Sequence, residues 1–310
     1  MNESTKPLLS ICCTTYNHEN YIAQTIDGFL MQLTSFPIEI LIHDDASTDR
    51  TADIIRRYEV EQPDTIKVIY QSENQFSKGK RPMLLNFKRA QGEYIAFCEG
   101  DDYWTDPYKL QKQVEFLEKN PTVAFCGHAV KQIDADGTTL QESQFNILED
   151  KHLAQEEIAF GHLGVPTLSL LFRNYGNFPS HSLINGDRVL LSFLSNFGGG
   201  YLSKENMGAR RIHPGGIWSL RPLKEQIDAR TLTLSKIPQL IDSERKSLAY
   251  FRFFIHSIKE DYSWKRKLKN IPLSFIMTLF WLRPTSLRFI FARIKKKFYG
   301  TSHLQQSPCQ

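Results

Sequence analysis

Cysteine is scarce in this chain. Five of the 310 residues are cysteine, an odd number, and four of them lie in apolar, strand-like runs without C-x-x-C spacing. Such cysteines are typical of buried thiols in a reducing compartment. The pattern therefore argues against a disulfide framework and against a cysteine-ligated zinc site.

Long apolar runs are also missing. The longest, Ile271 to Leu282, has twelve residues, whereas a helix needs about 20 to span a bilayer. Residues 1–7 lack the basic and apolar segments of a signal peptide. We therefore expect the chain to remain in the cytoplasm and not to span a membrane.

Glycine-rich phosphate loops are absent as well. No G-x-G-x-x-G follows the first expected strand, which disfavours a dinucleotide-binding dehydrogenase. No glycine-rich, Lys- or Arg-bearing loop that could cradle a triphosphate stands near the N-terminus. The absence of such a loop argues against an enzyme that builds sugar nucleotides.

Positive charge is concentrated towards the C-terminus. The net charge is +4, yet eleven Lys and Arg residues against two acids lie between Lys259 and Gly300. The segment 265–297 joins basic flanks to an apolar centre, a pattern typical of a peripheral contact with the inner face of the cell membrane. A core helix with a solvated basic rim is the alternative, and the pattern supports either. The apolar centre points to lipid and not to nucleic acid.

Apolar strand-like runs alternate with amphipathic stretches over the first 120 residues. Such alternation predicts an α/β protein with a mostly parallel central sheet flanked by helices. The predicted strands are 8–14, 38–43, 66–70 and 94–98, and the predicted helices are 21–31, 51–62, 83–90 and 109–119.

The alternation breaks after a further strand, 123–128. An Asp-Gly pair predicts a hairpin turn within 133–139. The remaining predictions are a strand at 165–172, a helix at 188–197 that ends at three glycines (198–200), and a cationic loop at 210–218. From Pro222 the sequence has a helical, charged texture. The expected domains are therefore 1–220, a helical basic region 221–300 and a disordered tail 301–310.

Acidic side chains follow two of the predicted strands. Glu99, Asp101 and Asp102 stand after strand 94–98, and Asp44-Asp45 follow strand 38–43. In open α/β sheets, ligands bind beyond the carboxyl ends of the strands. Clustered carboxylates there favour Mg²⁺ or Mn²⁺, with substrate phosphates completing the coordination. Acids that merely favour a turn or a helix N-terminus are the alternative explanation.

Five motifs resemble, in order, those of family 2 glycosyltransferases of the GT-A fold. They are Ser10-Ile-Cys-Cys-Thr-Thr-Tyr-Asn17, Ile40-Leu-Ile-His-Asp-Asp-Ala-Ser-Thr-Asp-Arg-Thr51, Gly92-Glu-Tyr-Ile-Ala-Phe-Cys-Glu-Gly-Asp-Asp-Tyr-Trp104, Asn185-Gly-Asp187 and Arg211-Ile-His213. The resemblance covers about residues 8–220, and five ordered motifs are far more specific than one. It implies a GT-A-type nucleotide-sugar-binding fold with a C-terminal helical extension. It also implies sugar transfer from a nucleoside diphosphate, with inversion at the anomeric carbon.

The resemblance implies a binding place for the base of the donor. Tyr16 would stack on the base and Asp45 would hydrogen-bond it. Thr15 and Asp44 would lie beside these two residues in the donor site.

The resemblance also implies a metal, a base and a diphosphate site. Asp101 would contact the ribose or the metal, and Asp102 would be the main metal ligand. Arg211 and His213 would lie near the diphosphate. Asp187 would be the general base that accepts the proton of the acceptor hydroxyl.

Two positions depart from the family pattern. Many members have Asp where this chain has Glu99, and the longer side chain makes direct metal coordination there doubtful. Many also have an acid where this chain has Gly186, directly before the expected base. Separately from the family, the position of Lys80 or Arg81 suggests a contact with the diphosphate.

A metal-dependent, inverting glycosyltransferase is the function that these features predict. The donor would be a UDP- or GDP-sugar, and the acceptor a glycan or glycolipid of lipid-linked or surface polysaccharide. A divalent ion would stabilise the departing diphosphate without a proton. Two alternatives stay open: a module that holds a nucleotide sugar without turnover, and a sugar nucleotidyltransferase.

Overall fold

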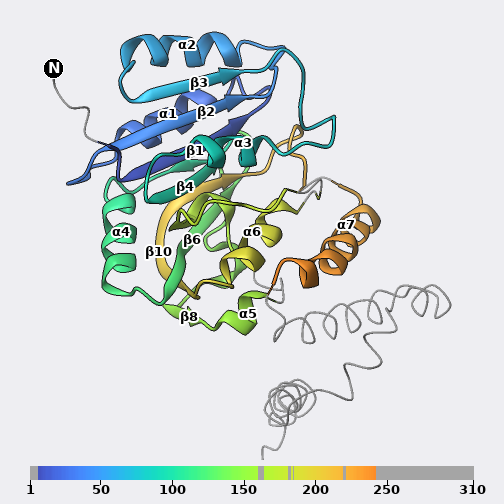
Figure 1. Cartoon of the computed structure of the whole chain (residues 1–310). Coiled ribbons are helices and arrows are strands. Elements are labelled where there is room, and N and C mark those ends of the chain that lie inside the picture. The colour runs from blue at the N-terminus through green and yellow to red at the C-terminus, as the bar shows by residue number, and fades with distance from the viewer. Residues whose placement is uncertain (1–5, 160–163, 181–182, 184, 219–220, 242–310) are drawn as a thin grey trace, which may run out of the picture.

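One mixed sheet runs through the described part of the chain (Figure 1). This computed structural model describes residues 6–159, 164–180, 183, 185–218 and 221–241. The strands follow the order β3-β2-β1-β4-β9-β6-β10-β5, with β7 paired to β6 and β8 paired to β10. Helices pack on both faces of this sheet, as the two hydrophobic clusters below show.

The first half of the sheet is parallel. It consists of β1 (Leu9–Thr15), β2 (Ile38–Asp44), β3 (Ile66–Tyr70) and β4 (Tyr94–Glu99). In register, Thr15 pairs with Asp44, and Thr14 pairs with Glu99. The carboxyl ends of these strands therefore form one common edge, as expected for βα units of this kind.

Alternate side chains of each strand pack on opposite faces, which explains why these strands are apolar throughout. On one face, Ile11 and its neighbours pack against α1 (Ile22–Leu30), α2 (Thr51–Glu61) and α4 (Lys109–Lys119). On the other face, Cys12 and its neighbours pack against α3 (Pro82–Arg89) and α6 (Gly186–Leu194). The predicted α/β architecture is confirmed.

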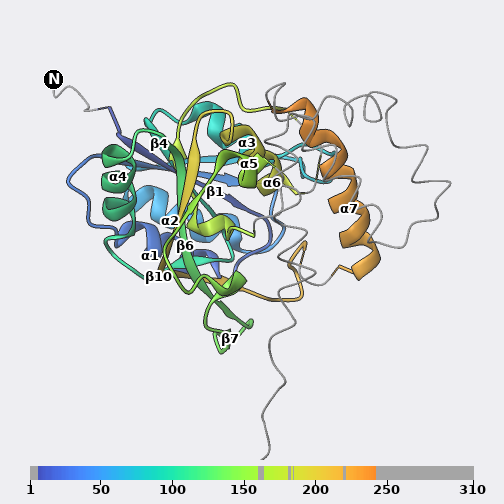
Figure 2. The same cartoon turned by 90° about the horizontal axis from the view of Figure 1, so that it is seen from below.

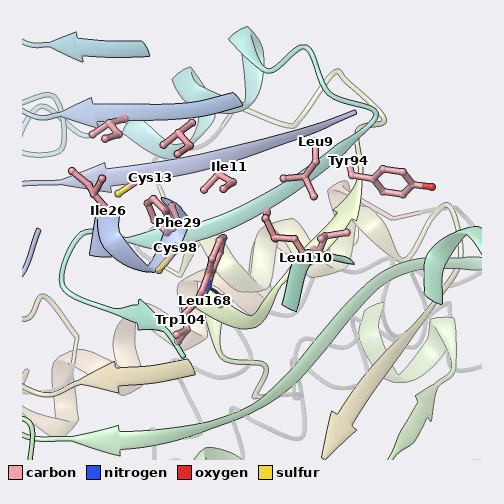
Figure 3. Close-up of a cluster of buried hydrophobic side chains, with 14 of the residues drawn as sticks. Leu9, Ile11, Cys13, Ile26, Phe29, Tyr94, Cys98, Trp104, Leu110 and Leu168 are labelled. Carbon is pink, nitrogen blue, oxygen red and sulfur yellow. Dashed lines mark hydrogen bonds between the residues drawn. The ribbon is translucent and has the colours of Figure 1, made fainter. Parts of the chain in front are cut away.

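Trp104 belongs to the first of these clusters, as Figure 3 shows. Its ring packs on Phe29 of α1, with centroids 4.8 Å apart, and its indole N–H donates to the carbonyl of Leu168 at 2.8 Å. A buried indole N–H needs such a partner. The contact joins the first half of the chain to the second.

The second half of the sheet is mixed. Its central strands are β6 (Val123–Ile133), β9 (Leu171–Arg173), β10 (Gly199–Arg211) and the short β5 (Tyr103–Trp104). β9 is antiparallel to both β4 and β6, whereas β10 is parallel to β6 and antiparallel to β5. The peripheral elements are β7 (Thr139–Gln141), β8 (Lys151–Leu153), α5 (Gln155–Ala159), α7 (Leu223–Lys236), and three 3₁₀ turns, η1 (Gln144–Asn146), η2 (Thr167–Ser169) and η3 (Ile237–Gln239).

Some sequence predictions for this half are confirmed and others are wrong. The Asp-Gly hairpin turn is confirmed, with Gly137 at φ +94° between β6 and β7. The long β10 was missed: residues 199–211 are a strand of 13 residues and not a glycine stop followed by a loop. The predicted strand 165–172 is a 3₁₀ turn followed by the three residues of β9. Strand β10 carries Gly, Lys, Glu and Asn, which favour strands poorly, so pairing with β6 determines its conformation.

Helix α7 lies beside α6 in both views (Figures 1 and 2). The hydroxyl of Thr233 in α7 donates to Asn185, the residue before α6, at 3.4 Å. The predictions of a membrane contact at 265–297 and a disordered tail at 301–310 lie outside the described residues. Within the described part, no helix has the length and apolar character needed to cross a bilayer.

Candidate functional site

Three side chains from distant segments meet at the carboxyl edge of the sheet. His18 follows β1, Asp101 follows β4 and His213 follows β10. Their possible ligand atoms all lie within 4.8 Å of one another. Nε2 of His213 is 2.9 Å from Oδ2 of Asp101, and Nε2 of His18 is 4.0 Å from the same oxygen. The edge predicted to bind ligand therefore carries a compact group of nitrogen and oxygen donors.

Gly100 fixes the loop that presents Asp101. A Cβ on Gly100 would lie 2.6 Å from Oγ1 of Thr15, so a side chain here would push the loop away from β1. The hydroxyl of Thr25 in α1 also holds this loop, because it donates to the carbonyls of Gly100 and Asp102. The close approach of the two strand tips requires glycine at this position.

The acids of this loop are in unequal environments. Burial raises the pKa of Glu99 to about 8, and the charge of Asp101 adds to the effect. Burial also raises the pKa of Asp102, again with help from Asp101. Burial also opposes the ionisation of Asp101, but the hydrogen bond to His213 and the charges of His18 and His213 together outweigh it and lower the pKa. Asp101 is therefore the acid best suited to carry a charge here.

The donor group fits a divalent transition metal. It offers one carboxylate oxygen and two imidazole nitrogens, and a histidine binds a metal only through an unprotonated nitrogen. Burial lowers the pKa of His18, which favours its neutral form. Oγ1 of Thr15 is 3.2 Å from the other ring nitrogen of His18 and can orient the ring. Mg²⁺ prefers oxygen and water ligands, so the two imidazole nitrogens favour a divalent transition metal over Mg²⁺.

Asp102, the predicted main metal ligand, is not one of these three residues, and its metal role stays a prediction. Its Oδ1 accepts the backbone N–H of Arg211 at 2.8 Å, and the side chain is 5% exposed. Asp102 thus fastens β10 to the loop after β4. Sequence reasoning missed His18. The signal was available, because His18 follows the first strand directly beside the acidic tip of β4.

Arg211, predicted to lie near the diphosphate, has several partners within the protein, and its contact with the diphosphate stays a prediction. Its guanidinium donates to the carbonyls of Asp101, Asp134 and Ala135 and to Oε1 of Gln24. It also lies over the ring of Tyr21, 4.7 Å from the centroid. Through these contacts the guanidinium links β10 to the loop after β4, to α1 and to the turn after β6.

Arg210 supplies positive charge to the acids, and sequence reasoning gave it no role. Its charge lowers the pKa of both Glu99 and Asp102 against the effect of burial. Alternation along β10 explains the difference between the two arginines, because adjacent residues of a strand point to opposite faces. The side chain of Arg210 therefore points to the side of the sheet on which Glu99 lies.

The predicted base-binding residues lie at the tips of β1 and β2. Tyr16 is 42% exposed, so its ring is accessible for stacking. Asp45 is buried, and its two carboxylate oxygens accept the backbone N–H groups of Gln75 and Phe76 at 2.7 and 2.9 Å. Asp45 thus anchors the loop after β3.

Asp44 and the two basic residues predicted near the diphosphate also have local partners. Asp44 accepts a hydrogen bond from the hydroxyl of Ser47. Nζ of Lys80 donates to Gln75, and Nε of Arg81 donates to the carbonyl of Leu183 at 2.7 Å. Tyr16 is thus the most accessible of the predicted donor-binding residues on this side.

Asp187 lies in the first turn of α6, next to Gly186. Its charge contributes to the raised pKa of Glu99, so the start of α6 faces the tip of β4. This helix belongs to the second hydrophobic face. Alternation along β4 from Ile95 and Phe97 places Glu99 on the same face. The predicted base is therefore on the side of the acidic loop opposite to α1.

The family model described as "Glycosyl transferase family 2" matches residues 10–175 of this chain. The uncharacterized protein Rv1520 of Mycobacterium tuberculosis is 36% identical over 219 residues, covering 68% of this chain and 60% of that protein. TuaG of Bacillus subtilis, named as a glycosyltransferase of teichuronic acid biosynthesis, is 40% identical over 139 residues, covering 44% of this chain and 52% of TuaG. The chain thus spans about 60% and about half of the lengths of these two relatives.

Solved structures share the fold. TarS of S. aureus (residues 1–349, in complex with UDP-GlcNAc) has a TM-score of 0.63 at 18% identity, covering 85% of this chain and 81% of that one. The mannosyltransferase PcManGT of Pyrobaculum calidifontis, in complex with GDP-Man and Mn²⁺, has a TM-score of 0.50 at 17% identity, covering 96% and 89%. The predicted GT-A-type fold is confirmed by these likenesses. The ordered motifs, the fold and the match to the family model agree, and the chain belongs to glycosyltransferase family 2.

Proposed function

We propose that this glycosyltransferase is metal-dependent and inverting, and that it transfers a sugar from a UDP- or GDP-sugar to an acceptor hydroxyl. The observation that carries the proposal is the convergence of His18, Asp101 and His213 at the edge of the sheet. The start of α6 brings Asp187 to the other side of the same acidic loop. A candidate metal site and a candidate base thus lie on two sides of one acidic loop.

The metal proposed for this site is Mn²⁺. Asp101 and His213 would hold it, with His18 as a third ligand, and a bound divalent ion stabilises the negative charge of a departing diphosphate. PcManGT is in complex with GDP-Man and Mn²⁺, and TarS with UDP-GlcNAc, which supports a nucleoside-diphosphate sugar as the donor. Tyr16 is proposed to stack on the base, since its ring is accessible at the end of β1.

Asp187 is the proposed general base. A carboxylate at this place accepts the proton of the acceptor hydroxyl while the oxygen attacks the anomeric carbon. The bond to the diphosphate breaks on the opposite face of the sugar, so a single displacement inverts the centre.

The acceptor proposed is a glycan or glycolipid of lipid-linked or surface polysaccharide. The name of TuaG, which places it in teichuronic acid biosynthesis, supports this class. We further propose that residues 1–220 form the catalytic domain and that 221–300 are a helical region whose basic part, 265–297, contacts the inner face of the membrane. Cytoplasmic donor sugars would then meet a membrane-bound acceptor.

Replacing Asp187 with Asn tests the proposal. With Mn²⁺ and either UDP-GlcNAc or GDP-mannose, Asp187→Asn should lower two rates by about 10²–10⁴-fold: the rate of sugar transfer and the smaller rate of donor hydrolysis. Thermal stabilisation by the donor should stay unchanged, because the base does not hold the nucleotide. Asp53→Asn is the matched control, since Asp53 also lies in the first turn of a helix and is exposed.

The same experiment separates the alternatives. A module that binds the nucleotide sugar without turnover would show donor stabilisation but no hydrolysis in the parent protein. A nucleotidyltransferase would make sugar nucleotide from a nucleoside triphosphate and a sugar phosphate. If Asp187→Asn retained full turnover, Asp187 would not be the base.

A further inference from the structure

An exposed aromatic ring stands on the segment between β7 and β8. Phe145 is 51% exposed, and it adopts a left-handed backbone conformation (φ +62°, ψ +13°) within η1. The next residue, Asn146, is also left-handed at φ +52°. Two consecutive non-glycine residues in this region carry a conformational cost, and such strain is concentrated where a side chain is held for a function.

The register of the strands places this segment at the level of the acidic loop. Leu171 of β9 pairs with Ala96 of β4 and with Cys126 of β6. β4 and β6 therefore run parallel to each other, on either side of β9. Glu99 is three residues after Ala96 and Ala129 is three residues after Cys126, so Glu99 and Ala129 are at the same height on the sheet. η1 packs on β6, and Ile147, which directly follows it, is buried in the cluster that contains Ala129.

The ring of Phe145 packs on the backbone of Gly164. A Cβ on Gly164 would lie 2.4 Å from Cδ1 of the ring, so only glycine permits this contact. From Gly164 the chain runs through η2 to β9, antiparallel to β4, and the N–H of Phe97 donates to the carbonyl of Leu170. Val165, the next residue, packs on Gly127 of β6, so Gly164 lies over β6 on the second hydrophobic face.

The surroundings of the ring are polar and incompletely paired. Oε1 of the neighbouring Gln144 is buried and has no hydrogen-bond partner within the described part of the chain. The amide of Gln141 donates to the carbonyl of Ser143 and, at 3.5 Å, to Oδ1 of Asn146, and both amides are at the surface. A flat apolar ring flanked by amides fits a sugar ring, whose C–H face packs on the aromatic ring while its hydroxyls bond to the amides.

We propose that Phe145 is the stacking platform of an acceptor subsite that binds a pyranose ring of the acceptor glycan. This inference rests on the proposed glycosyl transfer, and it assigns the acceptor to the side of the acidic loop on which Glu99 and Asp187 lie. The ring is fixed from one side by Gly164 and by the left-handed turn. The other side is open to the acceptor.

Saturation-transfer NMR with methyl glycosides of glucose, galactose, mannose and N-acetylglucosamine, without metal, tests the subsite. At least one glycoside should give a signal with the parent protein, and Phe145→Ala should reduce that signal at least fivefold. Phe145→Trp should retain it, because an indole also stacks. Phe145→Asn should reduce it as well, and Asn accepts the left-handed conformation, so this variant removes the ring without straining the turn. Leu148→Ala is the matched control, an exposed apolar side chain three residues away that should leave the signal unchanged.

Three results would overturn the subsite: no glycoside signal with the parent protein, an equal signal in Phe145→Ala, or an equal loss in Leu148→Ala. Binding to anionic lipid vesicles that is lost in Phe145→Ala, without glycoside binding, would assign the segment to lipid and also overturn it. Thermal stabilisation by UDP-GlcNAc or GDP-mannose with Mn²⁺ is measured in parallel. If the donors stabilise every variant and no glycoside binds, the subsite fails while the proposed donor chemistry stands.

Discussion

The two halves of the sheet are built in different ways. Strands β1 to β4 each pair in parallel with a neighbour. A helix follows β1, β2 and β3 directly, and α4 follows β4 after the short β5. From β9 to β5, the strands come from distant parts of the chain and pair in both directions. The first half depends on local sequence pattern, whereas the second depends on long-range pairing.

The candidate site needs both halves. Asp101 and His18 come from the regular half, while His213 and the start of α6 come from the irregular half. Arg211 links them through hydrogen bonds from its guanidinium to the carbonyl of Asp101 and to Gln24 of α1. Trp104 links them through its packing on Phe29 of α1. The regular half thus carries the proposed donor site, and the irregular half completes it and adds the proposed acceptor side.

The largest expected effect separates the two neighbouring acids of the loop after β4. Asp101→Asn should lower kcat/KM by about 10³-fold or more and abolish the Mn²⁺-dependent part of donor stabilisation, because it removes the anionic donor of the proposed metal site. Asp102→Asn should retain that Mn²⁺ dependence, because an amide oxygen can still accept the N–H of Arg211. Thermal shifts with UDP-GlcNAc or GDP-mannose, with and without Mn²⁺, measure the difference.

The reverse outcome would support the prediction, made from the sequence, that Asp102 is the main metal ligand. If Asp102→Asn lost the Mn²⁺ dependence and Asp101→Asn kept it, Asp102 would be the main ligand and the His18–Asp101–His213 group would not hold the metal. Asp106→Asn is the control for the mutation itself, since Asp106 pairs with Lys112 outside the site.

The next effect concerns the tie between the halves. Arg211→Lys keeps the charge but loses the planar set of donors that reaches three carbonyls and Gln24. Buried carbonyls left without a donor should lower the free energy of unfolding by about 2–4 kcal/mol. Urea denaturation measures this change. Arg50→Lys, at an exposed pair with Glu19, is the matched control and should change stability by less than about 1 kcal/mol. An equal effect of both variants would contradict the tie.

The difference between the regular and the irregular half of the sheet explains how much of the fold the sequence could predict. The runs that became β1 to β4 are apolar on both faces, and each is followed by an amphipathic helix, so pattern alone was sufficient. β10 offered no such pattern, because its glycines, Lys204, Glu205 and Asn206 favour a loop. Its conformation depends on register with β6, including two irregularities near Asn206, and register between distant segments cannot be read from local composition.

The site was predictable to a similar extent. The motifs located the edge of the sheet and drew attention to Asp101, Asp187 and His213. They could not show which of two adjacent acids lies with the two histidines, because that depends on the course of the loop around Gly100. They also could not show that the guanidinium of Arg211 is taken up by carbonyls of a turn 76 residues away in sequence.

The smallest expected effect concerns a buried lysine at the seam between the halves. Lys109 of α4 is fully buried, donates to Oε1 of Gln113 at 2.7 Å and lies 4.1 Å above the ring of Trp104. Burial lowers its pKa to about 7, against the opposing influence of Cys126 and Cys98. The seam therefore contains an amine that is neutral in the folded protein above this pH.

The sign of the pH effect follows from proton binding. An unfolded chain keeps Lys109 protonated up to about pH 10.4, so between pH 7 and that value the unfolded state binds one more proton than the folded state. The free energy of unfolding of the parent protein should therefore rise relative to Lys109→Met by about 1.4 kcal/mol per pH unit over this window, and the difference should be constant below pH 7. Urea denaturation from pH 6 to 9 measures the slope, with the exposed Lys119→Met as the control that follows the parent. A Lys109→Met variant that ran parallel to the parent throughout would mean that the buried amine is charged, and the seam would then hold a cation stabilised by Trp104 and Gln113.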